Sequence, residues 1–229
     1  MLLPPLTEGR LLRRYKRFLA DVELTDGRVV TAHTANTGSM QQCAVPGSRV
    51  LLSQSDNPKR KLAWSWELVE INGSWVDINT HRANRVVEEG LRTDQVGGLQ
   101  GFTVRPEYPY AESRIDFMLQ KDEQRVLVEV KNVTLCCQPT VACFPDVVTL
   151  RGQKHLRDLM AAVQEGWRAV IFFLVRRGEA QSFTPADDVD AEYGRLLRQA
   201  AECGVEVFAY RTLATPQQVV LDREVEVVL

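Results

Sequence analysis

The sequence predicts a mixed α/β protein in which a small β-barrel precedes a larger α/β domain. Five short strand signals follow one another between residues 18 and 78, with turn residues between them and no helical pattern. Beyond them, helical patterns alternate with strands. One of these strands, residues 169–175, is apolar at every position, which is typical of a strand covered on both faces of its sheet. We therefore expect a boundary at Asn79–Thr80, with one domain at 1–80 and another at 81–229.

The first domain is predicted to be a five-stranded barrel of the OB-fold type. Its strands are expected at residues 18–24, 28–33, 49–53, 61–71 and 75–78. The pairs Asp26–Gly27 and Asn72–Gly73 are turn signals, because Asn, Asp and Gly tolerate the left-handed backbone of tight hairpin turns. Barrels of this type often bind nucleic acid, so the basic and aromatic residues of the domain are candidates for that contact.

Basic and aromatic side chains are the candidate nucleic-acid contacts of the barrel. Arg13, Arg14 and Arg17 belong to a basic cluster that can contact phosphate groups, although a solvated chain start is the simpler interpretation. Trp64 and Trp66 lie two residues apart and therefore share one face of a strand. They are candidate platforms for stacked bases. Burial in the barrel core is the commoner use of such residues, and it is the interpretation that we favour.

The second domain is predicted to alternate helices and strands. Thr80 can cap a helix whose apolar side carries Ala83, Val86, Val87 and Leu91. Further helices are expected at residues 152–166 and after the acidic run at 187–190, and strands at 114–119, 125–131, 169–175 and 205–210, with an extended tail at 219–228. Residues 134–146, which contain two prolines, and the stretch with Glu107 and Tyr110 are expected to be loops.

Residues 114–131 carry the clearest chemical signal in the chain. Two apolar runs flank a polar segment, which predicts an antiparallel hairpin with a turn centred on residues 122 and 123. Such a turn pairs Asp116 with Glu129 across the hairpin, and Lys131 shares the face of Glu129. The alternative is an exposed hairpin with a weak surface salt bridge. The apolar neighbours of Glu129 favour a buried strand, on which unpartnered carboxylates are costly.

Two carboxylates and an ammonium group at the end of a buried sheet suit a hard divalent cation. The spacing Asp…Glu-x-Lys is the pattern of the PD-(D/E)xK nuclease superfamily. We therefore predict Mg²⁺ or Mn²⁺ at Asp116 and Glu129, with Glu88 or Glu107 as a further ligand. Lys131 is the candidate for positioning or deprotonating the attacking water.

The helix expected after the hairpin adds two candidates. Lys154 and His155 lie in its first turn, where the helix terminus favours anions, so both can contact a scissile phosphate. Simpler interpretations remain open for Glu88, as a solvated helix carboxylate, and for His155, as a polar residue at a helix start.

Composition restricts the class of protein. The 229 residues are 45% hydrophobic and 25% charged, with a formal net charge of −2, as in an ordinary globular protein. Five cysteines and three histidines match no zinc-binding spacing, so free thiols are expected. Pro4–Pro5 interrupts any signal peptide, and no apolar run is long enough to cross a bilayer. We expect a cytoplasmic protein with no membrane partner; the oligomeric state is left open.

Five sequence blocks resemble the sugar fermentation stimulation protein (SfsA) family. They are residues 35–40, 113–117, 129–135, 144–146 and 151–156, which occur in the family's order over nearly the whole chain. The resemblance implies an OB-like domain followed by a PD-(D/E)xK nuclease-like domain. It also implies non-specific DNA binding and a proposed role in regulating sugar (maltose) metabolism.

Three hypotheses on function follow. The first is a non-specific DNA-binding regulator with a divalent-metal site. The second is an active Mg²⁺-dependent nuclease that hydrolyses phosphodiester bonds of DNA or RNA. A weaker third is a small-molecule site in the cleft between the domains.

Overall fold

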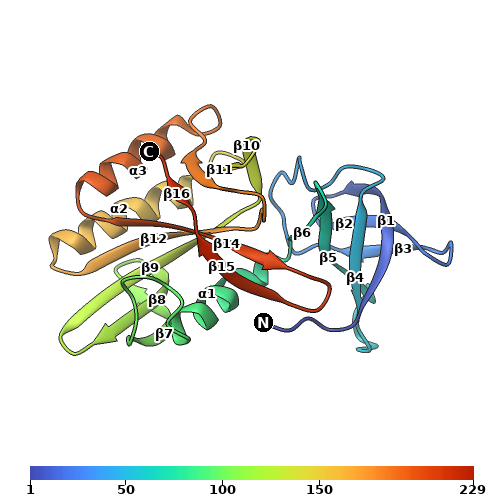
Figure 1. Ribbon diagram of the computed structural model, residues 1–229, viewed down its shortest axis with the longest axis horizontal. Helices are drawn as coiled ribbons and strands as arrows, with labels where there is room; N and C mark the ends of the chain where they lie inside the picture. Colours follow the sequence, from blue (N-terminus) through green and yellow to red (C-terminus); the bar gives the residue numbers. More distant parts are fainter.

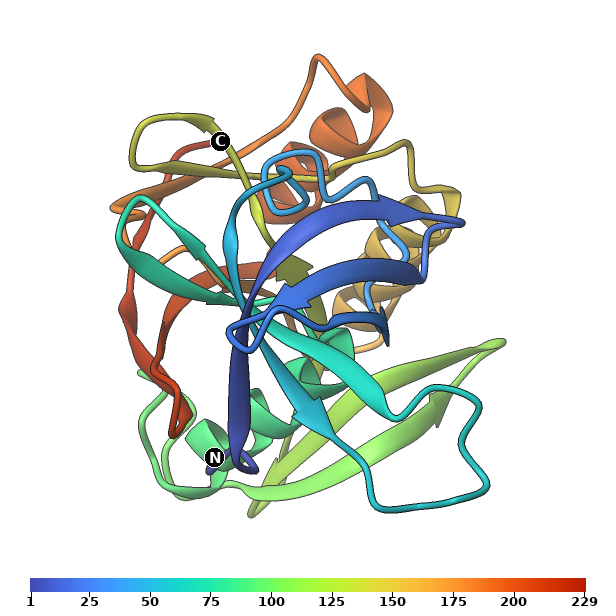
Figure 2. The same cartoon turned by 90° about the vertical axis from the view of Figure 1, so that its right-hand side faces the viewer.

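The first part of the chain forms a barrel, because alternating apolar and polar residues give each of its strands one side that can be buried. The computed structural model describes residues 1–229 and shows this barrel beside the α/β part of the chain (Figure 1). The barrel strands are β1 (Leu6–Tyr15), β2 (Leu19–Leu24), β3 (Val29–His33), β4 (Arg49–Gln54) and β5 (Trp64–Ile71). Antiparallel pairs join β3 to β2, β2 to β1, β1 to β4 and β4 to β5, and a short parallel pairing of β3 with β5 closes the ring. Figure 2 shows the barrel in front of the other elements.

The expected five-stranded barrel of OB type is confirmed, but its membership differs from the prediction. The basic cluster does not precede the first strand: Arg13 and Arg14 lie within β1, and Arg17 lies in the turn that follows it. Leu11 on β1 is fully buried, whereas its neighbours Arg10, Leu12 and Arg13 are exposed. A strand with only one buried side can carry many charges on its other side, so its sequence lacks the apolar run by which strands are usually recognised. The segment 75–78, in contrast, becomes β6 (Ser74–Asp77), a hairpin partner of β5 outside the closed ring.

A mixed sheet forms the centre of the α/β part. Its strands run in the order β14, β12, β9, β8, β7, with β15 paired to the outer side of β14. Their bounds are β7 (Thr103–Tyr110), β8 (Ser113–Lys121), β9 (Gln124–Val133), β12 (Arg168–Val175), β14 (Glu206–Ala214) and β15 (Val219–Glu224). Strands β9, β12 and β14 are parallel, and the others are antiparallel to their neighbours.

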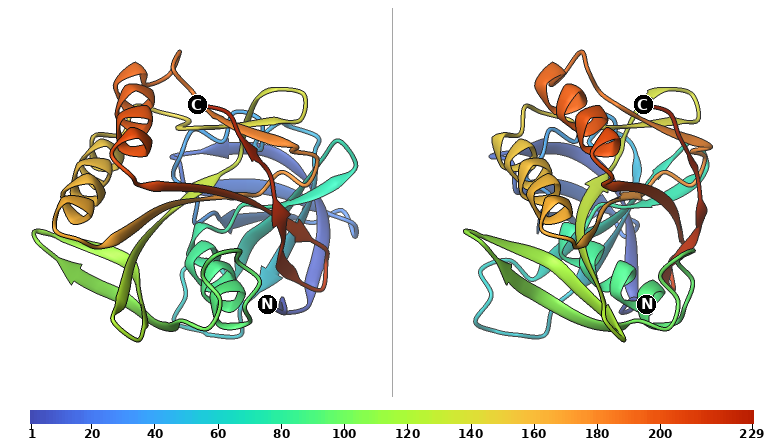
Figure 3. Two further views of the ribbon diagram at one scale, coloured as in Figure 1. Left: turned by 60° about the vertical axis from the view of Figure 1, so that its left-hand side comes forward. Right: turned by 90° about the vertical axis from the view of Figure 1, so that its left-hand side faces the viewer.

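Helices cover both faces of this sheet (Figure 3). They are η1 (Thr80–Arg82), α1 (Ala83–Arg92), α2 (Leu150–Gln164) and α3 (Ala191–Glu202). Alternate residues of β12 face the α2 and α3 side, through Ile171 and Phe173, and the α1 side, through Phe172 and Leu174. The prediction of a strand buried on both faces is therefore confirmed.

The predicted helices are confirmed, with shifted ends, whereas four strands of this part were missed. Asn79, not Thr80, caps η1 by accepting a hydrogen bond from the His81 amide. The segment with Glu107 and Tyr110 is the edge strand β7, in which two prolines are tolerated because an edge needs fewer ladder bonds. The stretch 134–146 contains the hairpin of β10 (Leu135–Gln138) and β11 (Val141–Phe144), which extends with β13 (Ser182–Pro185) and β16 (Glu226–Val227) into a small second sheet.

Several contacts join the barrel to the α/β part. Met1 to Leu3 run along residues 217–219 of the α/β part, so the start of the chain lies away from the barrel (Figure 1). Trp75 of β6 pairs with Ala214 of β14. The amide and hydroxyl of Ser39 both donate to the Asp146 carboxylate, at 3.0 and 3.1 Å.

The longest helix, α2, has 15 residues, and no helix combines the length and apolar character needed to cross a membrane.

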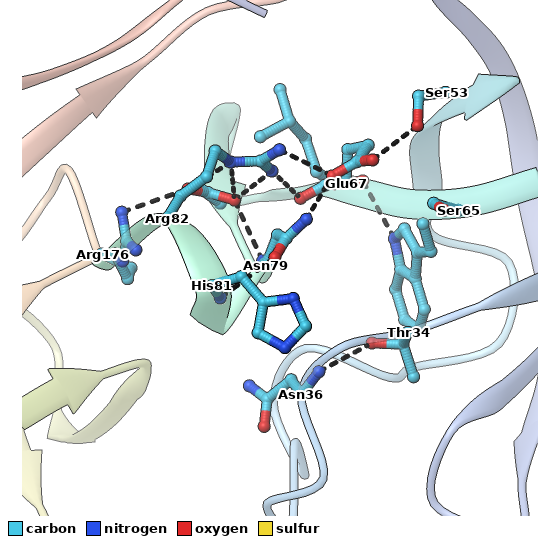
Figure 4. Close-up of polar contacts among 12 residues, drawn as sticks. Thr34, Asn36, Ser53, Ser65, Glu67, Asn79, His81, Arg82 and Arg176 are labelled. Carbon is cyan, nitrogen blue, oxygen red and sulfur yellow. Dashed lines mark hydrogen bonds and ion pairs between the residues drawn. The ribbon is translucent and has the colours of Figure 1, made fainter. Parts of the chain in front are cut away.

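A buried polar network lies where β5, β6, η1 and β12 meet (Figure 4). Arg82 donates to Glu67 at 2.7 Å and to Asp77, while Arg176, at the end of β12, forms an ion pair with Asp77 at 3.1 Å. Asn79 donates to the same Glu67 carboxylate at 2.9 Å. The side chains of Asp77 and Arg176 are fully buried. The network therefore connects the barrel strand β5 and its hairpin partner β6 directly to the end of β12.

Candidate functional site

The hairpin of β8 and β9 has the register that its sequence predicts. Phe117 pairs with Val128 and Lys121 with Gln124, which centres the turn on residues 122 and 123. The ladder ends at the Phe117–Val128 pair, directly next to Asp116 on β8 and Glu129 on β9. The hairpin thus brings the acidic residues of the motif to neighbouring positions on two strands.

Asp116 is a largely buried carboxylate held by two donors. One oxygen accepts a hydrogen bond from the Asn84 side chain on α1, and the other from the Val130 amide on β9, both at 2.7 Å. Burial, followed by repulsion from the Glu129 carboxylate, raises the pKa of Asp116 to about 6. Asp116 also lines a cavity of about 460 Å³ with His81, Asn84 and Arg85. The carboxylate is therefore accessible from outside although most of it is enclosed.

Glu129, Lys131 and His155 form a tight buried cluster on the α2 side of the sheet. The Lys131 Nζ donates to Glu129 Oε1 at 2.7 Å and lies 3.1 Å from His155 Nδ1, which also contacts Glu129 Oε1. Burial by itself would raise the pKa of Glu129, but the Lys131 charge and the His155 contact lower it overall. The second carboxylate oxygen, Oε2, is buried and has no hydrogen-bond partner.

The charges of Asp116 and Glu129 interact, although Asp116 is bonded to α1 and Glu129 to α2. An unpartnered buried oxygen is costly, and a cation beside it removes that cost. A cation would also offset the repulsion between the Asp116 and Glu129 carboxylates. No group of three or more Cys, His, Asp or Glu side chains is arranged to hold a metal ion. A magnesium site does not need three such side chains, because Mg²⁺ usually binds one or two carboxylates and completes its coordination shell with water and phosphate.

The two candidates for a third carboxylate lie at the rim of the Asp116 cavity. Glu88 forms an ion pair with Arg92 at 2.8 Å, one helical turn away. Glu107 forms an ion pair with Arg114 at 3.2 Å and is exposed. Each is thus partnered by an arginine, and only Asp116 among the three is largely buried.

The basic candidates divide into free and engaged side chains. Arg14 is engaged: its guanidinium donates to the carbonyls of Arg17, Asn36, Gly38 and Ser39 and so supports the loop after β3. This use inside the barrel argues against the predicted phosphate contact at Arg14. Arg13 forms an ion pair with Asp21 but remains exposed, and Arg17 is exposed at the β1–β2 turn. Lys154 is exposed and bonded to Ser113 and Asp158.

The tryptophan pair is used mainly as barrel core. Trp66 is only 1% exposed, and its indole N–H donates to the Leu68 carbonyl at 3.0 Å. Its ring cannot stack on a base, so that candidate role is wrong for Trp66. Trp64 is half-buried and packs against the same core. The interpretation as core, which we favoured because burial is the commoner use of such residues, is the one that the burial supports.

The sequence reading missed several residues around the motif. Asn84 binds Asp116, while His81, Arg85 and Arg151 lie at the rim of the site, Arg151 donating weakly to His155 at 3.4 Å. The only sequence signal for Asn84, His81 and Arg85 is that they occupy the polar side of η1 and α1. That signal does not distinguish a site from solvent, because most helices have such a face.

The first testable prediction concerns the proton on Asp116. In the metal-free protein we expect its carboxyl group to titrate near pH 6, about two units above the ordinary value of 3.8. The folded state then binds this proton more tightly than the unfolded state. The contribution of the group to the free energy of unfolding is therefore full below about pH 4 and is lost as the pH rises through 6.

Carboxyl ¹³C NMR on protein labelled at aspartate measures this titration, with Asp116→Asn used to assign the resonance. Asp187, exposed and with a pKa lowered by Arg198, serves as the internal control. Titration of Asp116 near pH 4 would contradict the burial and repulsion described above.

Both parts of the chain match models of known protein families. The family model "SfsA N-terminal OB domain" matches residues 12–78, and "Sugar fermentation stimulation protein RE domain" matches residues 81–218. A "Sugar fermentation stimulation protein homolog" of Syntrophotalea carbinolica is 64% identical over 223 residues, covering 97% of this chain and 96% of that protein. The homolog of Pelobacter propionicus is 54% identical, with both chains fully covered.

A solved structure has the same overall fold. It is described as the structure of Pyrococcus furiosus SfsA in complex with Ca²⁺, and it superposes with a TM-score of 0.91 at 26% sequence identity. The alignment covers 100% of this chain and 98% of the archaeal one.

Proposed function

Because this chain belongs to the sugar fermentation stimulation protein family, we propose that it binds nucleic acid without sequence preference and holds a divalent cation at Asp116 and Glu129. We further propose that this site hydrolyses phosphodiester bonds. One observation carries the proposal: the largely buried Asp116 and the buried Glu129, which has an unpartnered oxygen and a lysine beside it, are close enough for their charges to repel. The Ca²⁺ in the description of the archaeal relative supports a divalent cation in this family.

The residues of the site would divide the chemistry among them. Asp116 and Glu129 would hold the cation, which supplies Lewis-acid polarisation of the phosphate and a lowered pKa for bound water. The ammonium group of Lys131 would offset negative charge that develops on the phosphate oxygens. His155 contacts both Glu129 and Lys131, so its part is to position these two groups.

The groove beside the site suits a polyanion. His81 and Arg85 line the Asp116 cavity and are exposed. Arg151, which contacts His155, and Arg17 of the β1–β2 turn are also exposed. Charges of this kind contact phosphates and not bases, so affinity should depend strongly on salt and weakly on sequence.

A second candidate function is DNA binding without cleavage, as in a regulator of sugar (maltose) metabolism. The ion pair between Lys131 and Glu129 favours it, because a lysine engaged with a carboxylate is less available to phosphate or water. The two candidates share the binding groove and differ only in turnover.

One experiment separates them. Supercoiled plasmid, single-stranded DNA and RNA are incubated with the protein in Mg²⁺, Mn²⁺ or EDTA, and binding is measured in parallel at several salt concentrations. Cleavage that requires the cation supports the hydrolase. Binding without cleavage under any cation supports the second candidate, a DNA-binding protein without turnover. If neither binding nor cleavage is seen, the proposal as a whole is refuted.

A further inference from the structure

The most exposed aromatic ring of the barrel belongs to Phe18. It is 46% exposed, whereas Trp66 is buried. The backbone around Phe18 is well held, since its carbonyl accepts a hydrogen bond from the Thr34 amide at 2.9 Å. Its ring lies 6.5 Å from the His33 ring, inclined at 38°. An apolar ring presented on a supported backbone, and backed by a second ring, is a ready surface for another flat group.

Positive groups surround these two rings. Lys16 and Arg17, both exposed, precede Phe18 in the β1–β2 turn. Arg60 donates to the Ser65 hydroxyl at 2.9 Å, and Ser65 is the strand partner of His33. Burial, and then the nearby charges of Arg60 and His81, lower the pKa of His33, so its imidazole is neutral at neutral pH.

The rings connect to the candidate catalytic site through His81. His81 is close enough to His33 to affect its pKa, and it also lines the cavity that contains Asp116. Figure 4 shows the His81 ring on the side of Thr34 and Asn36, outside the Arg82 network. The Thr80 hydroxyl donates to the Ala35 carbonyl at 3.2 Å, which joins the two segments. His33 and His81 thus link Phe18, through neighbouring residues, to the cavity that contains Asp116.

We infer that Phe18, backed by His33, is a stacking platform for a base of single-stranded nucleic acid whose backbone continues past Arg60 and His81 to Asp116. This inference rests on the proposed function and adds the form of the substrate. Bases of a duplex are already stacked on each other, so an exposed ring on a barrel recognises a base only when the strand is single. The exposed Lys16 and Arg17, which precede Phe18, can contact the phosphates beside such a base.

The test compares binding to single strands with and without bases. Fluorescence anisotropy in EDTA measures affinity for an oligothymidylate, for an abasic strand of the same length and for a blunt duplex. Phe18→Ala should weaken binding of oligothymidylate about tenfold and leave the abasic strand and the duplex unchanged. Phe18→Trp should retain wild-type affinity, because tryptophan also stacks.

Two further variants calibrate the result. Val29→Ala removes another exposed apolar side chain, 60% exposed on β3 of the same barrel, and should change nothing. Arg60→Ala should weaken the oligothymidylate and the abasic strand alike and reduce the dependence on salt.

The outcomes distinguish this inference from the proposed function. Wild-type binding that Phe18→Ala leaves unchanged, or weakens equally for the oligothymidylate and the abasic strand, overturns the stacking platform alone. Absence of wild-type binding to all three probes overturns nucleic-acid binding itself, and the platform with it. Selective loss on the strand with bases, restored by Phe18→Trp, establishes the platform.

Discussion

Replacing Asp116 by asparagine is expected to abolish cation-dependent cleavage of nucleic acid, with a loss of at least about 10³-fold in rate, or about 4 kcal/mol of transition-state stabilisation. Only two carboxylates are placed to hold the cation, and the amide would remove one negative charge from that pair. Lys131→Ala should lower the rate by a similar factor by removing the charge beside Glu129 and leaving that carboxylate buried without its main partner. Initial rates on single-stranded DNA in Mg²⁺ and Mn²⁺ measure both losses.

Nucleic-acid affinity provides the control for these variants. Asp116→Asn should keep wild-type affinity in EDTA or slightly exceed it, because it removes negative charge from a surface that faces phosphate. Glu88→Gln is the matched variant: Glu88 lines the same cavity but is paired with Arg92, so we expect nearly full cleavage. Full activity of Asp116→Asn would refute the site, and loss of activity in Glu88→Gln would make Glu88 a third ligand.

Replacing Arg82 by methionine is expected to destabilise the whole protein by about 3–5 kcal/mol. Arg82 neutralises Glu67 and Asp77, and all three side chains are at most 8% exposed. Methionine has a similar length but no charge, so the carboxylates would remain buried with only Arg176 to offset them. The change should appear as a lower urea midpoint, measured by tryptophan fluorescence and circular dichroism.

A surface arginine controls for the loss of charge. Arg195 forms an exposed ion pair with Glu192 on α3, so Arg195→Ala should unfold at the wild-type urea concentration. If Arg82→Met also unfolded there, the network would contribute no net stability.

Because the network joins β5 of the barrel to β12, we also expect Arg82→Met to loosen the position of the barrel beside the site. This loosening would lower the affinity for long single strands while cation binding at Asp116 is retained.

Local patterns in the sequence were sufficient to predict most elements of the α/β part and the hairpin that carries the candidate site. The hairpin register followed from symmetric spacing about residues 122 and 123, because side chains alternate strictly along a strand. The burial of β12 followed from an unbroken apolar run, and the inner face of α1 from its helical period. Asp116, Glu129 and Lys131 could be grouped for the same reason: one hairpin contains all three.

Tertiary structure alone decided the features that depend on contacts between distant segments. Strand β1 is hidden by its charges, and only closure of the barrel shows that Leu11 is buried. His155 reaches Glu129 from a helix 26 residues away along the chain, and Asn84 reaches Asp116 from another 32 residues away. Arg14 and Arg17 look alike in sequence, yet one supports a loop and the other remains exposed. In each case spacing along the chain determines a side chain's local face, while the packing of separate elements determines what that face meets.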